Sequence, residues 1–194
     1  MTEKEKHTIQ TLMTRAKGIR ISVAKMIHGA KSGHIGGSLG MSDVFSVLYF
    51  YQMKHDPVNP SMPDRDRLIL SNGHLAPVRY AAMAHAGYFP VEELMTLRKI
   101  HSRLQGHPHH LDLPGLEIST GSLGMGLGVA TGAALAAKKT GADYTIYCSL
   151  GDGELQEGSV WEAAMFAGNH KLDNLIAFVD RNFIQIDGNT EEVM

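Results

Sequence analysis

The chain has 194 residues, of which 43% are hydrophobic and 20% are charged. These proportions are typical of a folded globular protein and exclude a disordered or fibrous one, and the length fits one domain with a sizeable core. A formal net charge of -2 excludes a broad basic surface for nucleic acid. The sequence contains no run of about 18 apolar residues, the length of a membrane span. We therefore expect no nucleic-acid partner and no membrane partner.

Cysteine usage and the first residues indicate a cellular compartment. Cys148 is the only cysteine, so an internal disulfide is impossible and a reducing cytoplasm is expected. Its place in an apolar run predicts a small buried side chain. The opening residues MTEKEKHTIQ lack the apolar core of a secretion signal. The expected location is the cytoplasm.

Helical periodicity begins early in the chain. Apolar residues recur at steps of three and four from Ile9 to Ile27 and predict an amphipathic helix that ends near Gly29. The glycine-dense stretch 31–40 predicts a loop held against a ligand or a partner. Ser42 and Asp43 are then predicted to cap a second helix.

The middle of the chain contains strand and helix signals in turn. Residues 67–70 predict a short buried strand that ends in a polar segment with a histidine. Pro77 suits the first turn of the next helix, and Gly87 suits its end. The Gly- and Ala-rich stretch 121–138 predicts a helix packed closely on a neighbouring backbone or subunit.

Two apolar runs, 144–150 and 174–180, flank a helix-like segment and predict a strand, a crossover helix and a second strand. Such a crossover makes the strands parallel, so their carboxyl ends lie at the same edge of the sheet. The predicted fold class is α/β, a parallel sheet flanked by helices on both faces, with ligands bound at the carboxyl ends of the strands.

Polar residues follow both of these strands. Asp152 comes just after the first and Asn182 just after the second, so they can meet in space. A carboxylate and an amide oxygen suit Mg²⁺, which usually takes further oxygens from a phosphate ligand. Gly151 and Gly153 let the backbone approach that ligand closely. The alternative is that Asp152 caps the following helix and Asn182 holds a turn.

The string GDGELQEGSVWEAAMFAGNHKLDNLIAFVDRNFIQIDG, which starts at Gly151, resembles the thiamine-diphosphate signature of transketolases. Nearly the whole chain, as far as Gly188, resembles their amino-terminal, diphosphate-binding domain. The resemblance implies a thiamine-diphosphate-binding fold, with thiamine diphosphate and Mg²⁺ as cofactors. It also implies transfer of a two-carbon ketol unit from a ketose phosphate to an aldose phosphate, and a place in the pentose phosphate pathway.

The resemblance also assigns roles to individual residues. The metal ligands it implies are the side chains of Asp152 and Asn182 and the backbone carbonyl of Ile184. The cofactor-binding residues it implies are His74, Gly121, Leu123, Gly151, Asp152, Gly153 and Asn182. The catalytic residues it implies are His34, His74, His107 and Glu157, the last bonded to an activating glutamate of a partner domain.

Simpler interpretations exist for several of these residues. A single histidine usually has a surface or structural role, and Glu157 also suits the positive end of a helix dipole. Gly121 also suits tight helix packing. His107, His109 and His110 could form a zinc cluster, although no cysteine and no HxxxH spacing accompanies them.

Two departures from the family pattern affect the expected function. The string SGHIGGSLG replaces the commoner SGHPGAPLG and resembles the amino-terminal subunits of split transketolases, and to a smaller degree the deoxyxylulose-phosphate synthases. Family members continue beyond this chain and need a pyrimidine-binding domain, so we expect residues 1–194 to be truncated at the C-terminus. A separate C-terminal subunit would complete a homo- or hetero-oligomer that acts on sugar phosphates, and the chain alone would be inactive. The alternatives are a deoxyxylulose-phosphate synthase-like enzyme and a non-catalytic, partner-binding remnant.

Overall fold

The computed structural model describes residues 2–194, which form two compact units that alternate along the sequence. The first unit comprises residues 2–62, 74–106 and 111–115. The second comprises residues 63–73, 107–110 and 116–194. No helix within the described residues is long and apolar enough to cross a membrane.

The first unit is helical, and its longest element is α1 (Glu3–Ala30). A capping box begins this helix: the Glu5 amide donates to the Thr2 hydroxyl at 3.3 Å, and the Thr2 amide donates to the Glu5 carboxylate at 2.6 Å. The helix ends where Lys31 adopts a left-handed conformation, with φ of 51°. The predicted first helix is confirmed, and it starts before its apolar stripe because the capping box lies outside that stripe.

The next segment differs from the prediction in two ways. The glycine-dense stretch contains a short helix, α2 (Ile35–Gly40), which α3 (Ser42–Val47) follows almost directly. Ser42 and Asp43 make no capping hydrogen bond. Because α2 lies immediately before it, the Ser42 hydroxyl donates to the Ser38 carbonyl at 3.0 Å. Asp43 instead pairs with Arg20 of α1.

The remaining helices of the first unit are η1 (Leu48–Gln52), α4 (Ala76–Ala86) and η3 (Val91–Thr96). Pro77 lies in the first turn of α4, as predicted. Gly87 ends this helix in a left-handed conformation with φ of 98°, which confirms the predicted stop. The short η2 (Gly73–Leu75) precedes α4.

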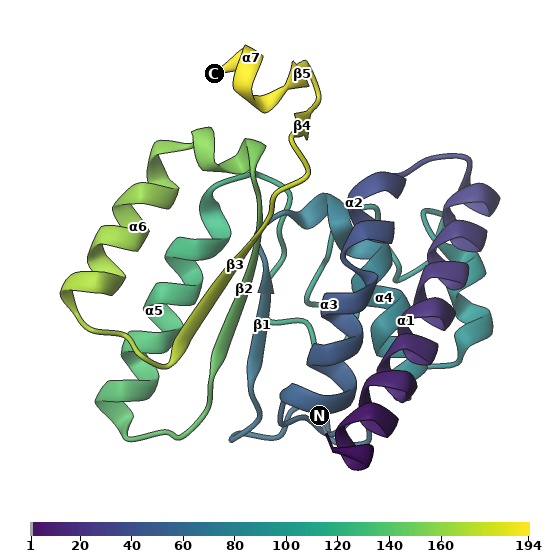
Figure 1. The fold of residues 1–194 in the computed structure, drawn as a ribbon, viewed down its shortest axis with the longest axis horizontal. Coiled ribbons are helices and arrows are strands. Elements are labelled where there is room, and N and C mark those ends of the chain that lie inside the picture. Colours follow the sequence, from purple (N-terminus) through teal and green to yellow (C-terminus); the bar gives the residue numbers. More distant parts are fainter. Residues whose placement is uncertain (1) are drawn as a thin grey trace. The chain divides into compact units, whose positions relative to one another are not determined.

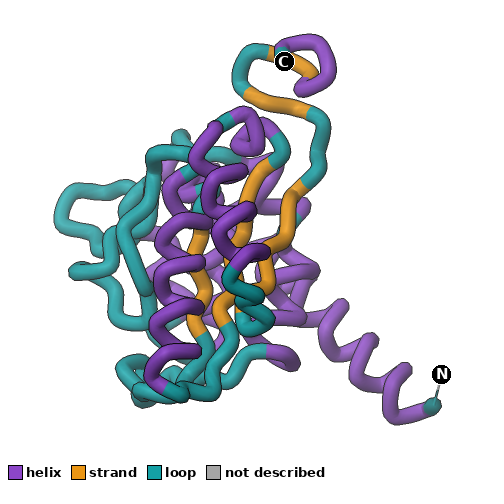
Figure 2. The backbone as a smooth tube through the Cα atoms, turned by 90° about the vertical axis from the view of Figure 1, so that its left-hand side faces the viewer, coloured by secondary structure: helices purple, strands orange, loops and turns teal. Residues whose placement is uncertain are grey.

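The second unit contains a three-stranded parallel sheet in the order β1 (Arg67–Leu70), β2 (Ile146–Gly151) and β3 (Leu175–Asp180). Leu70 pairs with Ser149, and Gly151 pairs with Asp180. The predicted strands and their parallel direction are confirmed, and the arrows in Figure 1 show their carboxyl ends at one edge. Figure 2 shows the three strands side by side.

Two helices, α5 (Met125–Thr140) and α6 (Gly158–Asn169), pack against one face of this sheet (Figure 1). The core between them uses alternate residues of β2: Ile146, Cys148 and Leu150. Cys148 is fully buried, as predicted, and burial raises the pKa of its thiol. The fold is therefore α/β, a parallel sheet flanked by helices.

The small residues of α5 allow one close approach. A Cβ on Gly126 would lie 2.5 Å from the Ser71 Cβ and 2.6 Å from the Ser71 Cα, so this part of α5 touches the backbone at the end of β1. A Cβ on Gly132 would meet nothing within 4 Å. The prediction of close packing on a neighbouring backbone is therefore confirmed for the first turn of α5, and Ala130 and Ala134 in its middle are fully buried.

Short elements surround the carboxyl edge of the sheet. The turn η4 (Gly153–Gln156) follows β2. After β3 come the antiparallel pair β4 (Ile184–Gln185) and β5 (Gly188–Asn189), and then α7 (Thr190–Val193), all beyond the end of the sheet in Figure 1.

Candidate functional site

The Gly151–Gly153 turn and the segment after β3 lie against each other at the carboxyl edge. The Asp152 amide donates to the Asp180 carbonyl at 3.1 Å. The Asp152 carboxylate is buried and accepts hydrogen bonds from the Gly153 amide at 2.9 Å and the Phe183 amide at 2.6 Å. The two segments predicted to supply a metal site are thus brought together by the parallel pairing of their strands.

Asn182 lies on this segment, but its side chain is engaged locally. Its Oδ1 accepts a hydrogen bond from the Ile184 amide at 3.0 Å, and its Nδ2 donates to Asp180 at 3.1 Å. Asp152 also bonds the first amide of η4. The alternative roles are therefore both observed: Asp152 caps η4, and Asn182 holds a turn. An amide oxygen has two lone pairs, so the Asn182 Oδ1 keeps the capacity for a further partner.

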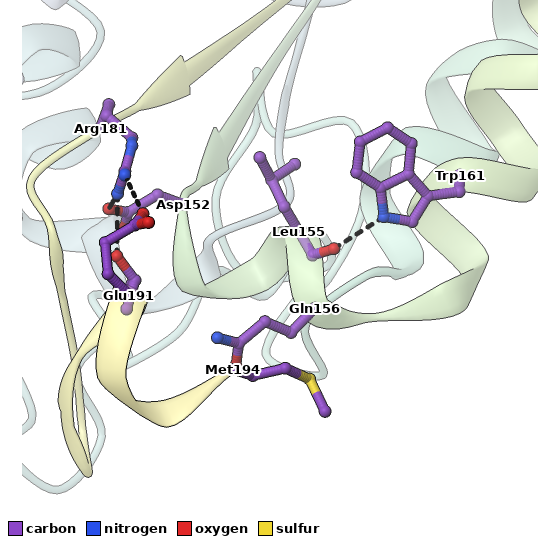
Figure 3. Close-up of a pocket in the computed structure, with 8 residues that line it drawn as sticks. Asp152, Leu155, Gln156, Trp161, Arg181, Glu191 and Met194 are labelled. Atoms are coloured by element: carbon purple, nitrogen blue, oxygen red, sulfur yellow. Dashed lines mark hydrogen bonds and ion pairs between the residues drawn. The ribbon is translucent and has the colours of Figure 1, made fainter.

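Arg181 was not singled out by the sequence, although it directly precedes the predicted metal ligand. Its guanidinium donates to the Asp152 carboxylate at 3.0 Å and to the Thr190 hydroxyl at 2.8 Å, and it also pairs with Glu191. The hydrogen bond to Asp152 is the main cause of the raised pKa of Arg181. Figure 3 shows this guanidinium between the two carboxylates. A cation therefore already balances the charge of Asp152.

A cavity of about 490 Å³ adjoins this cluster (Figure 3). Its wall combines charged and polar groups with the apolar side chains of Leu155, Trp161 and Met194. The full lining is Asp152, Leu155, Gln156, Trp161, Arg181, Thr190, Glu191 and Met194. The Trp161 indole donates to the Leu155 carbonyl at 2.8 Å, which holds one side of the cavity. This hollow beside a carboxylate has room for a ligand.

Gly121 and His107 are neighbours within the second unit. A Cβ on Gly121 would lie 3.6 Å from the His107 ring, and the Thr120 amide donates to the Pro108 carbonyl at 3.2 Å. A Cβ on Gly73 would lie 2.9 Å from the Gly121 amide nitrogen. The glycine segment therefore lies against the end of β1, as tight packing would require, and His107 is beside it.

Glu154 is a second residue that the sequence analysis did not identify. It is only 2% exposed, and its carboxylate accepts hydrogen bonds from the Ser71 hydroxyl, the Gly124 amide at 2.8 Å and the Gly151 amide at 3.0 Å. The Ser71 hydroxyl in turn accepts from the Gly126 amide at 3.0 Å. The only local signal for Glu154 was an acidic residue between Gly153 and Leu155 in a turn. The sequence does not show which distant groups its carboxylate binds, because the fold decides them.

His34 and His74 lie together in the first unit. Their ring centroids are 5.0 Å apart, with an angle of 57° between the planes. His34 precedes α2 and is exposed, whereas His74 lies in η2 and is half-buried. Two adjacent imidazoles can bind oxygen atoms and exchange a proton near neutral pH.

Glu157 is exposed at the start of α6 and makes no capping hydrogen bond with its side chain. Leu123 lies on the preceding glycine segment and is 36% exposed. Both side chains are accessible at the surface of the second unit. This exposure suits contact with another molecule, and it also suits the dipole role considered for Glu157.

The zinc alternative gains no support from the structure. No group of three or more His, Cys, Asp or Glu side chains is placed to hold a metal anywhere in residues 2–194. His110 instead contacts Ser119, whose hydroxyl lies 3.0 Å from its Nδ1. A magnesium site built from one carboxylate, one amide and one carbonyl is a different type of site, because it needs only a single acidic side chain.

The residues at the carboxyl edge fit a polar ligand. A Cβ on Gly151 would meet nothing within 4 Å, so there is open space beside the end of β2. The Asn72 amide group and the Ser149 hydroxyl are buried and have no hydrogen-bond partner within the described part of the chain. Buried polar groups are normally bonded. Space and unused polar groups at the ends of β1 and β2 suit a diphosphate with its metal ion.

Comparison with known proteins identifies a family. The family described as "Transketolase, thiamine diphosphate binding domain" matches residues 12–194. The 6-deoxy-6-sulfo-D-fructose transketolase subunit SqwG of Clostridium sp. is 48% identical over 182 residues, which cover 94% of this chain and 66% of that protein. An apulose-4-phosphate transketolase subunit of Phocaeicola vulgatus is 44% identical over 186 residues, which cover 96% and 66%.

Solved structures agree with the family match. The crystal structure of transketolase from Campylobacter jejuni has a TM-score of 0.89 and 42% identity, and the match covers 95% of this chain and 30% of that chain. This chain therefore spans about two thirds of the two similar subunits and less than a third of the Campylobacter jejuni transketolase chain.

Proposed function

The chain belongs to the transketolase family, in its thiamine diphosphate-binding domain, and on this premise we propose that it is the cofactor-binding part of a two-subunit transketolase. The observation that carries the proposal is the carboxyl edge of the sheet, where Asp152, Gly151 and the segment after β3 converge beside open space. The proposed reaction is transfer of a two-carbon ketol unit from a ketose phosphate to an aldose phosphate.

The cofactor would be held at this edge. Asp152, the Asn182 Oδ1 and the Ile184 carbonyl would bind Mg²⁺, and backbone groups of Gly121 and Leu123 would contact thiamine diphosphate. When bound, the cofactor supplies the electron sink for breaking and forming the carbon–carbon bond. Mg²⁺ binding requires the carboxylate of Asp152, which Arg181 occupies in this structure.

His34, His74 and His107 are proposed to act on the sugar. The pair formed by His34 and His74 would bind substrate oxygens, stabilise developing negative charge and carry a proton between them. His107, beside Gly121, would act next to the cofactor-binding segment.

A second subunit is proposed to complete the active site by supplying the pyrimidine-binding domain. Three large apolar side chains of α6 are exposed, with Trp161 at 57%, Met165 at 68% and Phe166 at 43%. Exposed apolar groups of this size mark contact surfaces on proteins. Glu157, at the start of the same helix, would meet the activating glutamate of that partner.

Two measurements test this proposal. Calorimetry of the chain with Mg²⁺ and thiamine diphosphate, with and without the partner subunit, should show binding that the partner strengthens. Assays with xylulose 5-phosphate and ribose 5-phosphate should show turnover only when both subunits are present. Turnover by this chain alone would contradict the proposed division of the active site.

The donor sugar needs a panel of substrates, because the similar subunits are named for different sugars. 6-Deoxy-6-sulfo-D-fructose and apulose 4-phosphate belong in that panel beside xylulose 5-phosphate. Pyruvate with glyceraldehyde 3-phosphate is the control, since turnover of this pair would indicate a synthase instead of a transketolase.

A further inference from the structure

We propose that Glu154 is a positioning residue that sets the spacing of the two backbone segments against which the cofactor's diphosphate lies. This inference rests on the proposed function. Glu154 is not one of the implied metal ligands or catalytic residues, and it is almost fully buried, at 2% exposed. It therefore acts on the site through the groups it binds.

One carboxylate connects three elements. Its Oε1 accepts from the Gly124 amide at 2.8 Å, at the start of α5, and from the Ser71 hydroxyl at the end of β1. Its Oε2 accepts from the Gly151 amide at 3.0 Å, at the end of β2. The distance between the two glycine segments is thus determined by the width of a single carboxylate group.

The chemistry of these contacts makes the arrangement specific. All three donors are neutral, a hydroxyl and two backbone amides. Burial of a carboxylate is costly unless its lone pairs are used, and hydrogen bonds to a charged acceptor are shorter and stronger than neutral ones. Only an arrangement that keeps all of the donors in place offsets that cost, so alternative positions of Gly124 and Gly151 are disfavoured.

The two glycines that Glu154 binds differ in their surroundings: Gly151 is open to a ligand, and Gly124 is held by a second residue. Gly151 borders open space, whereas Gly124 has φ of +82° and its carbonyl accepts from the Ser159 hydroxyl at 3.1 Å. A Cβ on Gly124 would lie 2.7 Å from the Glu157 Cβ. The turn that contains Asp152 and the segment that contains Leu123 are therefore held in register by Glu154.

Glu117 provides a matched control within the same unit. Its carboxylate side chain is 7% exposed and accepts from the Leu68 amide at 2.8 Å and from Arg65 at 2.6 and 2.9 Å. It is thus also a nearly buried carboxylate that holds a backbone amide of β1, but it acts at the amino end of that strand. At both positions, glutamine has nearly the same size as the glutamate it replaces and removes one negative charge.

The experiment compares Glu154→Gln with Glu117→Gln in the full chain together with its partner subunit. Glutamine keeps one acceptor oxygen and places an NH2 donor at the position of the other, so the amide that faces this donor, that of Gly124 or of Gly151, should exchange hydrogen at least about tenfold faster by NMR. The Kd for thiamine diphosphate in the presence of Mg²⁺ should rise by about 10- to 100-fold, as for other residues that orient ligand-binding groups. Glu117→Gln should lower the Tm but change that Kd by less than about twofold.

The outcomes separate this inference from the proposed function. If the wild-type protein fails to bind thiamine diphosphate, the proposed function is wrong, and the amide exchange rates still test the role of Glu154. If the wild type binds and Glu154→Gln binds equally well, the positioning role is wrong. Should Glu154→Gln not fold, Ser71→Ala removes one donor and keeps the carboxylate, and it should weaken binding by about threefold or more. An unchanged Kd in that folded variant would also overturn the inference.

Discussion

Two carboxylates of the same turn, Asp152 and Glu154, differ in what holds them. Both are largely buried, at 7% and 2% exposed. Glu154 is bonded to groups at the end of β1, at the end of β2 and directly before α5. Asp152 shares its charge with Arg181, whose side chain is 42% exposed. The comparison teaches that Glu154 is held only by neutral donors of the surrounding fold, whereas Asp152 combines two backbone amides with the charge of a partly exposed arginine.

The largest expected effect comes from Asp152→Asn. If Asp152 is the charged ligand of the metal site, its loss should weaken Mn²⁺ or Mg²⁺ binding by at least about 100-fold, because hard divalent cations depend on carboxylate charge. Electron paramagnetic resonance of Mn²⁺ measures this directly. The asparagine oxygen can still accept from the Phe183 amide, so circular dichroism should show a folded chain. Unchanged Mn²⁺ affinity would mean that the metal lies elsewhere.

The next largest effect is expected from Gly126→Ala, which tests the packing around the hydrogen bonds of Glu154. The added methyl group would overlap the Ser71 backbone at 2.6 Å and disturb the hydroxyl that bonds Glu154. Overpacking of this kind costs about 1–3 kcal/mol in the free energy of unfolding. Urea denaturation measures the loss.

Gly132→Ala is the control for that substitution, because it lies in the same helix with nothing within 4 Å of the added atom. It should stabilise the chain by about 0.5–1 kcal/mol, the usual gain in a helix interior. An equal effect of both substitutions would mean that α5 is not pressed on the end of β1.

A smaller effect appears at alkaline pH. Burial, with the charge of Glu154 as a second cause, raises the pKa of Cys148 above its ordinary value of 9.0. Above pH 9.0 the unfolded thiol loses its proton while the folded one keeps it, so the unfolded state binds fewer protons and stability falls as pH rises. The expected loss is about 1.4 kcal/mol at pH 10. Urea titrations at pH 8 to 10 should show a shallower decline for Cys148→Ala, and equal slopes would contradict this linkage.

The smallest effect comes from Arg181→Met, which removes the cation that balances Asp152. The Arg181 side chain is 42% exposed, so solvent weakens its pairing with the buried Asp152, and Mg²⁺ affinity should rise only about two- to fivefold by calorimetry. Lys138→Met, which breaks the exposed pair with Asp173, should leave that affinity unchanged. Weaker Mg²⁺ binding in Arg181→Met would show that the guanidinium supports the metal site instead of competing with it.

Much of the fold could be predicted because it depends on local patterns. The apolar periodicity of α1, the strand runs around Cys148 and Val179, and the stop at Gly87 each depend on residues close in sequence. Ser42 and Asp43 were misassigned because the preceding helix α2 begins within a glycine-rich stretch that has low helix propensity. Packing against α1 and the carbonyl of Ser38 decided their contacts.

The candidate site divides in the same way. The sequence by itself determined the parallel strands and hence the meeting of Asp152 with the segment of Asn182, because strand direction follows from the crossover. Only the tertiary structure decided the partners of Glu154 and Arg181. Those partners come from segments up to 83 residues away, and no local pattern encodes which distant amide or carboxylate a buried side chain will reach.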